Sequence, residues 1–191
     1  DWYFQYLLAA GVPFIMEKFD VTETEAAALI KTHVQLCYDV CHFALVYETP
    51  QRVLERLQHY GLKVGRLQIS AALKALMPPV GPAREKVIAA FRTFNEPIYL
   101  HQVIARKENG GFEHYPDLPE ALADADNPQV EEWRSHFHVP VFIADFGVLT
   151  STREDIVQAL TRQKSQPFTA HLEVETYTWD VLPPALKQDI A

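Results

Sequence analysis

The stretch VQLCYDVCHFALVYETPQRVLERLQHYGLKVGRLQIS, residues 34–70, predicts the class of the fold. Its apolar start is typical of a buried strand, and LKVGRLQIS, residues 62–70, has the branched apolar residues and the length of a second one. Between them, Pro50 at a first helical turn and Gly61 at a C-terminal cap mark a helix over residues 50–60. Two buried strands joined by a helix indicate a parallel βαβ unit.

The same alternation of helices and strands continues along the chain. Thr22 and Glu25 form a capping box, which predicts a helix that runs to His33. This pattern predicts an α/β fold with one domain over residues 1–191. The other expected elements are a helix end within residues 1–9, Pro-rich turns and a helix within 70–94, a strand at 97–105, a loop at 107–132, an extended segment at 136–144, a helix at 151–163 and a strand at 171–179.

The charge and hydropathy pattern exclude some partners. Asp and Glu total 25 against 17 Lys and Arg, which gives a formal charge of −8, and the basic residues form no block. Nucleic acids are bound through clustered Lys and Arg, so we expect no nucleic-acid partner. The apolar N-terminus is interrupted by Gln5, Gly11 and Pro13 and lacks a basic flank, which predicts no signal peptide and no membrane span.

The two cysteines, Cys37 and Cys41, stand four residues apart. On a strand they would be too far apart and too constrained for a good disulfide, so we expect buried free thiols. A metal-binding or redox role is the alternative. Free thiols favour a reducing compartment, and we therefore expect a cytoplasmic protein.

Polar side chains gather where the expected strands end. At the carboxyl ends of the parallel strands in an α/β barrel the following loops converge, and functional groups collect there. Residues two apart on a strand share a face, so His136 with His138, and Glu173 with Glu175, can each aim two groups into one cavity. Imidazole and carboxylate ligands mixed in this way suit a divalent metal such as Zn or Mn. The candidates are Asp39, His42, Gln68, Ser70, His101, His136, His138, Glu173 and Glu175.

Each candidate also has a purely structural interpretation. His101 can be a hydrogen-bonded core histidine, and Asp39 with His42 can cap and orient the turn that follows a strand. Glu173 can face solvent, and Trp179 can pack strands against helices rather than line a pocket. We favour one shared polar cavity, because it accounts for all the strand-end groups with a single assumption.

Three segments resemble the EboE metabolite traffic proteins. These are CYDVCH at 37–42, LQISAAL at 67–73 and, as the most specific of the three, HLEVETYTWDVLPPALK at 171–187. That family belongs to the xylose isomerase-like superfamily, whose fold is a TIM (β/α)8 barrel. The resemblance implies that residues 1–191 form the C-terminal part of such a barrel within a longer protein.

The resemblance also implies roles for individual residues. Gln68 departs from it, because the superfamily usually has a His at that strand end. Glu175 and His136 would be the catalytic residues. The implied metal ligands are Asp39, His42, His138 and Glu175. The implied substrate-binding residues are Gln68, His101, Glu173 and Trp179.

These roles lead to an enzyme hypothesis and a binding hypothesis. In the first, a divalent-metal enzyme isomerises or hydrolyses a small sugar-like or polar metabolite, and Glu175 or a neighbouring His moves a proton. In the second, the protein is a non-catalytic metabolite-binding or carrier component, which the replacement at Gln68 favours. The resemblance implies partner proteins of a metabolite-export pathway for either one. A third possibility, cleavage of DNA at abasic sites, is disfavoured by the acidic charge.

Overall fold

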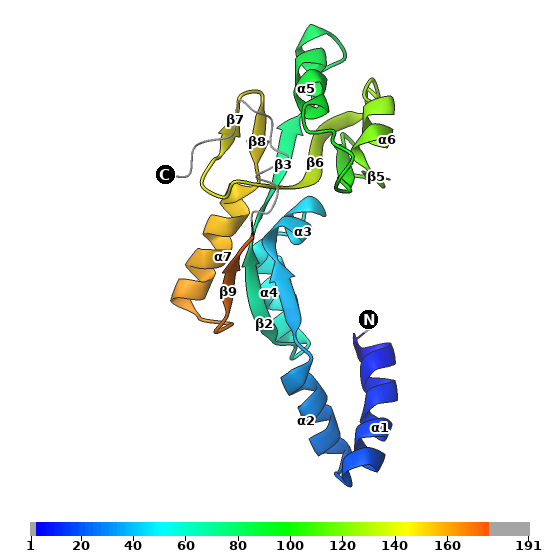
Figure 1. Ribbon diagram of the computed structural model, residues 1–191, viewed down its shortest axis with the longest axis vertical. Coiled ribbons are helices and arrows are strands. Elements are labelled where there is room, and N and C mark those ends of the chain that lie inside the picture. The colour runs from blue at the N-terminus through cyan, green and yellow to red at the C-terminus, as the bar shows by residue number, and fades with distance from the viewer. Residues whose placement is uncertain (1–2, 176–191) are drawn as a thin grey trace.

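The structure is a computed structural model, and it describes residues 3–175. Its N-terminal part is a helical hairpin that projects from the rest of the chain (Figure 1). The hairpin consists of η1 (Tyr3–Leu8), α1 (Ala9–Phe19) and α2 (Glu23–His33). The predicted capping box is present, because the Thr22 hydroxyl accepts from the Glu25 backbone N–H and the Glu25 carboxylate accepts from the Thr22 backbone N–H.

A parallel sheet of three strands follows the hairpin. It contains β1 (Leu36–Asp39), β2 (Val64–Ile69) and β9 (Leu172–Val174), with β2 in the centre. Buried side chains of β1 and β2, such as Tyr38 and Leu67, belong to one core with apolar residues of the helices, such as Val53 and Ile156. The helices that accompany this sheet are α3 (Val40–Leu45), α4 (Pro50–His59) and α7 (Arg153–Ser165).

An antiparallel sheet of six strands occupies the middle of the chain. Its strand order is β5-β4-β6-β3-β8-β7. Only Ser70 separates β2 from β3, so one length of chain passes from the parallel sheet straight into the antiparallel one (Figure 1). The strands are β3 (Ala71–Leu76), β4 (Val103–Lys107), β5 (Phe112–Tyr115), β6 (Val130–Val139), β7 (Asp145–Phe146) and β8 (Leu149–Ser151), and the helices are α5 (Pro82–Arg92) and α6 (Leu118–Ala123).

The expectation of a TIM barrel is wrong, although the α/β class is correct. Within the described residues the parallel strands number three, and the strands between residues 71 and 151 pair antiparallel. Short apolar runs look alike in parallel and antiparallel strands, so the segments around residues 97–105 and 136–144 did not reveal their partners. Parallel pairing, which repeated βαβ units would require, is therefore limited to β1, β2 and β9 in the part of the chain that the structure describes.

Two local expectations within the antiparallel sheet are also wrong. AALKAL, at residues 71–76, was expected to belong to the turns before a helix, but it forms β3, one of the two central strands of the sheet. Residues 107–132 were expected to be a loop, but they contain β5, α6 and the start of β6. Ala and Leu favour helices, and the Pro and Gly residues of the second segment favour turns, so in both places tertiary pairing overrides local preference.

A buried arginine fastens the antiparallel sheet to α5. The side chain of Arg84 is 1% exposed, and its guanidinium donates to the carbonyls of Pro78, Asn127 and Val130 at 2.7, 2.5 and 2.6 Å. These carbonyls lie on segments before α5 and after α6. The guanidinium thus provides charged donors to backbone carbonyls in the turn before α5, and just before and at the start of β6.

Replacing Arg84 by Met should lower the free energy of unfolding by about 2–4 kcal/mol, because buried carbonyls would lose a charged donor. Chemical denaturation followed by circular dichroism measures this change. Arg92→Met is the matched control, since Arg92 is an exposed residue of the same helix. Equal midpoints for the two variants would show that Arg84 does not hold these segments together.

Candidate metal centre

The candidate site begins at the end of β1. Asp39 is the last residue of this strand and the N-cap of α3, and one of its carboxylate oxygens, Oδ1, accepts from the backbone N–H of His42 at 3.4 Å. The same Oδ1 accepts from the hydroxyl of Ser70 at 2.5 Å. Asp39 and His42 are therefore placed by a helix cap, and their side chains lie 3.7 Å apart between Oδ2 and Nε2.

Two further imidazoles reach this point from β6. The Nε2 atoms of His136 and His138 are 2.9 Å apart, while Phe137 between them is buried in the core. The ring of His42 lies 4.5 Å from the ring of His136 and 6.1 Å from that of His138, measured between centroids. Three imidazoles and one carboxylate thus form a cluster where the parallel sheet meets β6.

An irregularity in β6 coincides with these histidines. Ala71 of β3 pairs with Val139, and Leu73 pairs with Ser135, so a step of two residues on β3 corresponds to four on β6. Extra residues in one strand are typical of β-bulges, which re-aim side chains and occur often beside functional sites. His136 and His138 both lie within the irregular segment.

The last parallel strand adds a second carboxylate. The backbone N–H of Glu175, the residue that follows β9, donates to the carbonyl of Ile69 at 3.0 Å. This contact holds Glu175 beside the end of β2, and its Oε2 is 3.4 Å from Nδ1 of His138. The carboxylate is a quarter exposed, which leaves it open to solvent on one side.

The cluster has the spacing of a metal site. One ligand atom each from Asp39, His42 and His138 lies within 4.8 Å of the other two. Bonds of about 2.0–2.2 Å to a common ion would place such atoms roughly 3–4.4 Å apart, so small side-chain rotations suffice to close the site. His42 is exposed, whereas His138 is buried, so an ion held here would face solvent on the side of His42.

Burial sets the protonation of the two β6 histidines. It lowers the pKa of His136 to about 4, with neighbouring His138 and His42 acting in the same direction. Burial likewise lowers the pKa of His138 to about 4, against the opposing charge of Asp39. Both rings are neutral at pH 7, and a neutral imidazole offers one lone pair to a metal. Burial and nearby Asp39 raise the pKa of Glu175.

The remaining predicted site residues lie around this cluster or apart from it. Gln68 pairs in register with Asp39 and Glu173, and its side-chain oxygen accepts from the thiol of Cys37 at 3.2 Å. Glu173 forms an ion pair with Arg66. His101 is 2% exposed and contacts the carbonyl of His136 and the carboxylate of Glu96, which is the structural role considered above. Trp179 lies outside the described residues.

Two residues contribute to the site in ways that the sequence did not indicate. Ser70 was a candidate without an assigned role, and its hydroxyl donates to Asp39 and accepts from the backbone N–H of Cys41 at 3.0 Å. Arg66 occupies the polar side of β2 and pairs with Glu173. Alternation along β2 could have indicated Arg66, because residues 66, 68 and 70 are polar and share one face.

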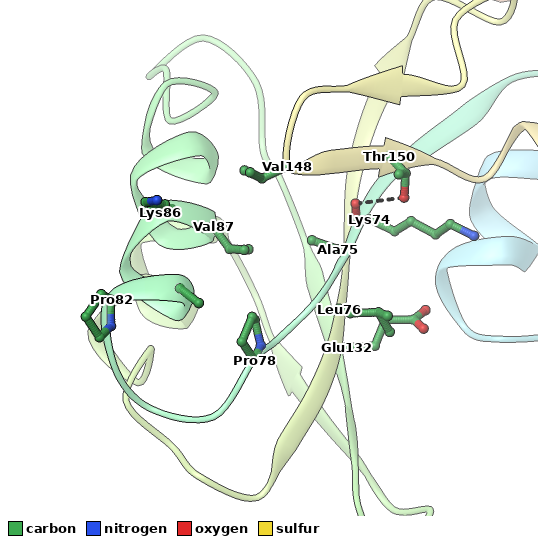
Figure 2. A pocket seen from close by; sticks show the side chains of 11 residues that line it. Lys74, Ala75, Leu76, Pro78, Pro82, Lys86, Val87, Glu132, Val148 and Thr150 are labelled. Carbon is green, nitrogen blue, oxygen red and sulfur yellow. Dashed lines mark hydrogen bonds between the residues drawn. The ribbon is translucent and has the colours of Figure 1, made fainter.

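A large groove lies elsewhere on the molecule. It has a volume of about 860 Å³ and is bounded by β3, β8 and α5, with Leu76, Pro78, Val87 and Val148 among its lining residues. Figure 2 shows that its walls are mainly apolar and that Glu132 and Thr150 lie at one side. The groove contains none of the clustered histidines, so its size does not make it the site of metal chemistry.

Comparison with protein families, with characterised proteins and with solved structures found no significant match to this chain. Within residues 3–175, no helix is both long and apolar enough to cross a membrane. The case for function therefore depends on the geometry of the site.

The metal-free protein should lose stability as the pH falls from about 6.5 towards 4. The unfolded chain takes up protons on its histidines below pH 6.5, whereas His136 and His138 in the folded protein resist protonation until about pH 4. Thermal unfolding in the presence of a chelator, measured across this range, checks the slope. The His136→Gln/His138→Gln double variant should flatten it, whereas His59→Gln, at an exposed position, should leave it unchanged.

Proposed function

We propose that this protein holds a divalent metal through Asp39, His42 and His138 and uses it to act on a small polar metabolite. The observation that carries the proposal is the convergence of these ligand atoms within 4.8 Å. A carboxylate and two imidazoles are ligands that suit Zn, Mn or a similar ion. The exposed edge at His42 leaves room for a substrate next to the ion.

One face of the parallel sheet carries polar side chains that suit a polar substrate. Residues paired in register carry their side chains on the same face, and here those residues are polar. The opposite face holds Tyr38, Leu67 and Ile69, which are buried in the core. This polar face includes Asp39, which belongs to the metal cluster, so it offers hydrogen-bond donors and acceptors beside the ion. Its members are Cys37 and Asp39 on β1, Arg66 and Gln68 on β2, and Glu173 on β9.

The surrounding residues can move a proton. A bound divalent ion would polarise a carbonyl or hydroxyl oxygen of the substrate. Glu175 lies beside His138, and burial and nearby Asp39 raise its pKa, which favours a carboxyl group that takes up and returns a proton. His136, neutral and half-buried, is the second candidate for this task. We assign proton transfer to Glu175 first, because its carboxylate retains access to solvent.

The resemblance to the EboE family adds a proposal about biological context. It rests on sequence segments, since the described residues do not form the barrel that it implied. We propose from it only that the metabolite belongs to a processing or export pathway and that partner proteins of that pathway exist. A cytoplasmic location is part of the same proposal, and it is supported by two free thiols: Cys41, which is buried as expected, and Cys37, which is exposed rather than buried.

Metal content is the direct test of the proposal. We expect the protein purified without chelator, or reconstituted with Zn or Mn, to contain about one ion per chain by elemental analysis. His138→Ala should abolish stoichiometric binding, because two of the available ligand groups include this residue. His42→Ala should weaken Mn binding by at least about tenfold while leaving the fold intact, since His42 is exposed.

The matched control is His59→Ala, which changes another exposed histidine. It should bind metal as the unchanged protein does. A folded protein that takes up neither Zn nor Mn after reconstitution would overturn the metal-dependent function and leave the metabolite-binding role. Unchanged metal content in a folded His138→Ala variant would show that the ion is bound elsewhere.

A further inference from the structure

We propose that the centre has a second, inner metal position, formed by Cys41, His136 and His138, which takes a thiophilic ion such as zinc or cobalt. It builds on the proposed function, because His138 serves both positions. One ligand atom from each of these three residues lies within 4.8 Å of the other two. The inner position differs from the outer one, formed by Asp39, His42 and His138, in its ligands and in its access to solvent.

The thiol of Cys41 is held towards the histidines. Cys41 lies in the first turn of α3, and its backbone N–H donates to the hydroxyl of Ser70 at 3.0 Å. Ser70 in turn donates to Asp39, so one hydroxyl fixes a residue of each metal position. A cysteine that only filled space would need no imidazole nitrogens nearby, whereas the sulfur of Cys41 lies within 4.8 Å of a ring nitrogen of each of two histidines.

The two positions have opposite chemical preferences. Cys41 is fully buried, His138 is 1% exposed and His136 is half-buried, so the inner position is less open to water than the outer one, which includes exposed His42. A thiolate with two imidazoles suits Zn, Co or Cu(I), whereas the carboxylate of the outer position also suits Mn. When an ion binds at the inner position, the thiol proton leaves to solvent and sulfur forms the bond to the metal.

The two positions exclude each other. A neutral imidazole offers one lone pair, so His138 can bind only one ion at a time. An ion at the inner position therefore removes a ligand from the outer one. The identity of the bound metal therefore decides which position is occupied. At the outer position, beside exposed His42, a substrate can reach the ion.

Titration of the metal-free full chain with Co²⁺ tests the inner position. Bound at Cys41, cobalt should show an intense thiolate-to-metal charge-transfer band in the near ultraviolet, with a stoichiometry of one. Cys41→Ser should lose this band. Cys37→Ser is the matched control and should keep it, because the chain has only these two cysteines. Zn²⁺ should displace the cobalt and abolish the band, as zinc binds such ligands more tightly.

The cobalt spectrum of the protein without substitutions is itself a test of the inference. Cobalt bound without a charge-transfer band would overturn the inner position, yet it would leave the outer position and the proposed function standing. A band that persists in Cys41→Ser but disappears in Cys37→Ser would also overturn it. A band that persists in His42→Ala, with weakened Mn binding in the same variant, would support two positions. If neither Co²⁺ nor Mn²⁺ binds, the inference and the proposed function both fail.

Discussion

The structure depends on one extended segment of chain that contributes a strand to each of the two sheets. β2 is the centre of the parallel sheet, β3 is an inner strand of the antiparallel sheet, and only Ser70 lies between them. A strand that changes sheets must satisfy its backbone and side-chain polar groups at the crossing, where regular pairing is interrupted. Ser70 is fully buried there, and its hydroxyl bonds to Asp39 and to the backbone of Cys41.

The crossing creates the candidate site. Parallel strands bring their carboxyl ends to one edge, which places Asp39 and Glu175 on either side of the end of β2. Pairing of β3 with β6 then sets the histidines against this edge, since Val139 lies opposite Ala71, the first residue after the crossing. Neither sheet alone contains the full set of ligands, so the chemistry exists only at their junction.

The sequence predicted the helices and strands that have a local signal, and it indicated most residues of the cluster. The capping box of α2, the proline at the start of α4 and the alternation in β2 each have a local physical cause, and all three were predictable. The histidines of β6 were recognisable because alternate imidazoles on one strand are uncommon. Their proximity to Asp39 was expected from the convergence of parallel strand ends in a barrel, whereas in the structure it results from the antiparallel pairing of β6 with β3.

The pairing of strands that are distant in the sequence could not be predicted. The partner of a strand is chosen by shape and burial across the whole fold, so AALKAL gave no sign that it would pair with β6 on one side and with β8 on the other. The irregular register in β6 likewise has no local signature, yet it lies where the two histidines reach the centre. The position of the thiol of Cys41 beside them also depends on these pairings and on the bond from its backbone to Ser70.

The energetics of the cluster argue that it serves chemistry rather than stability. Burial holds His136 and His138 neutral, and their ring nitrogens face each other where apolar side chains would pack at lower cost. The charge of Asp39 also helps to raise the pKa of Glu175, so ionising the Glu175 carboxyl is costly here. A fold selected only for stability gains nothing from this arrangement. A divalent cation would offset the cost of burying these groups, because it attracts both carboxylates and binds imidazole lone pairs.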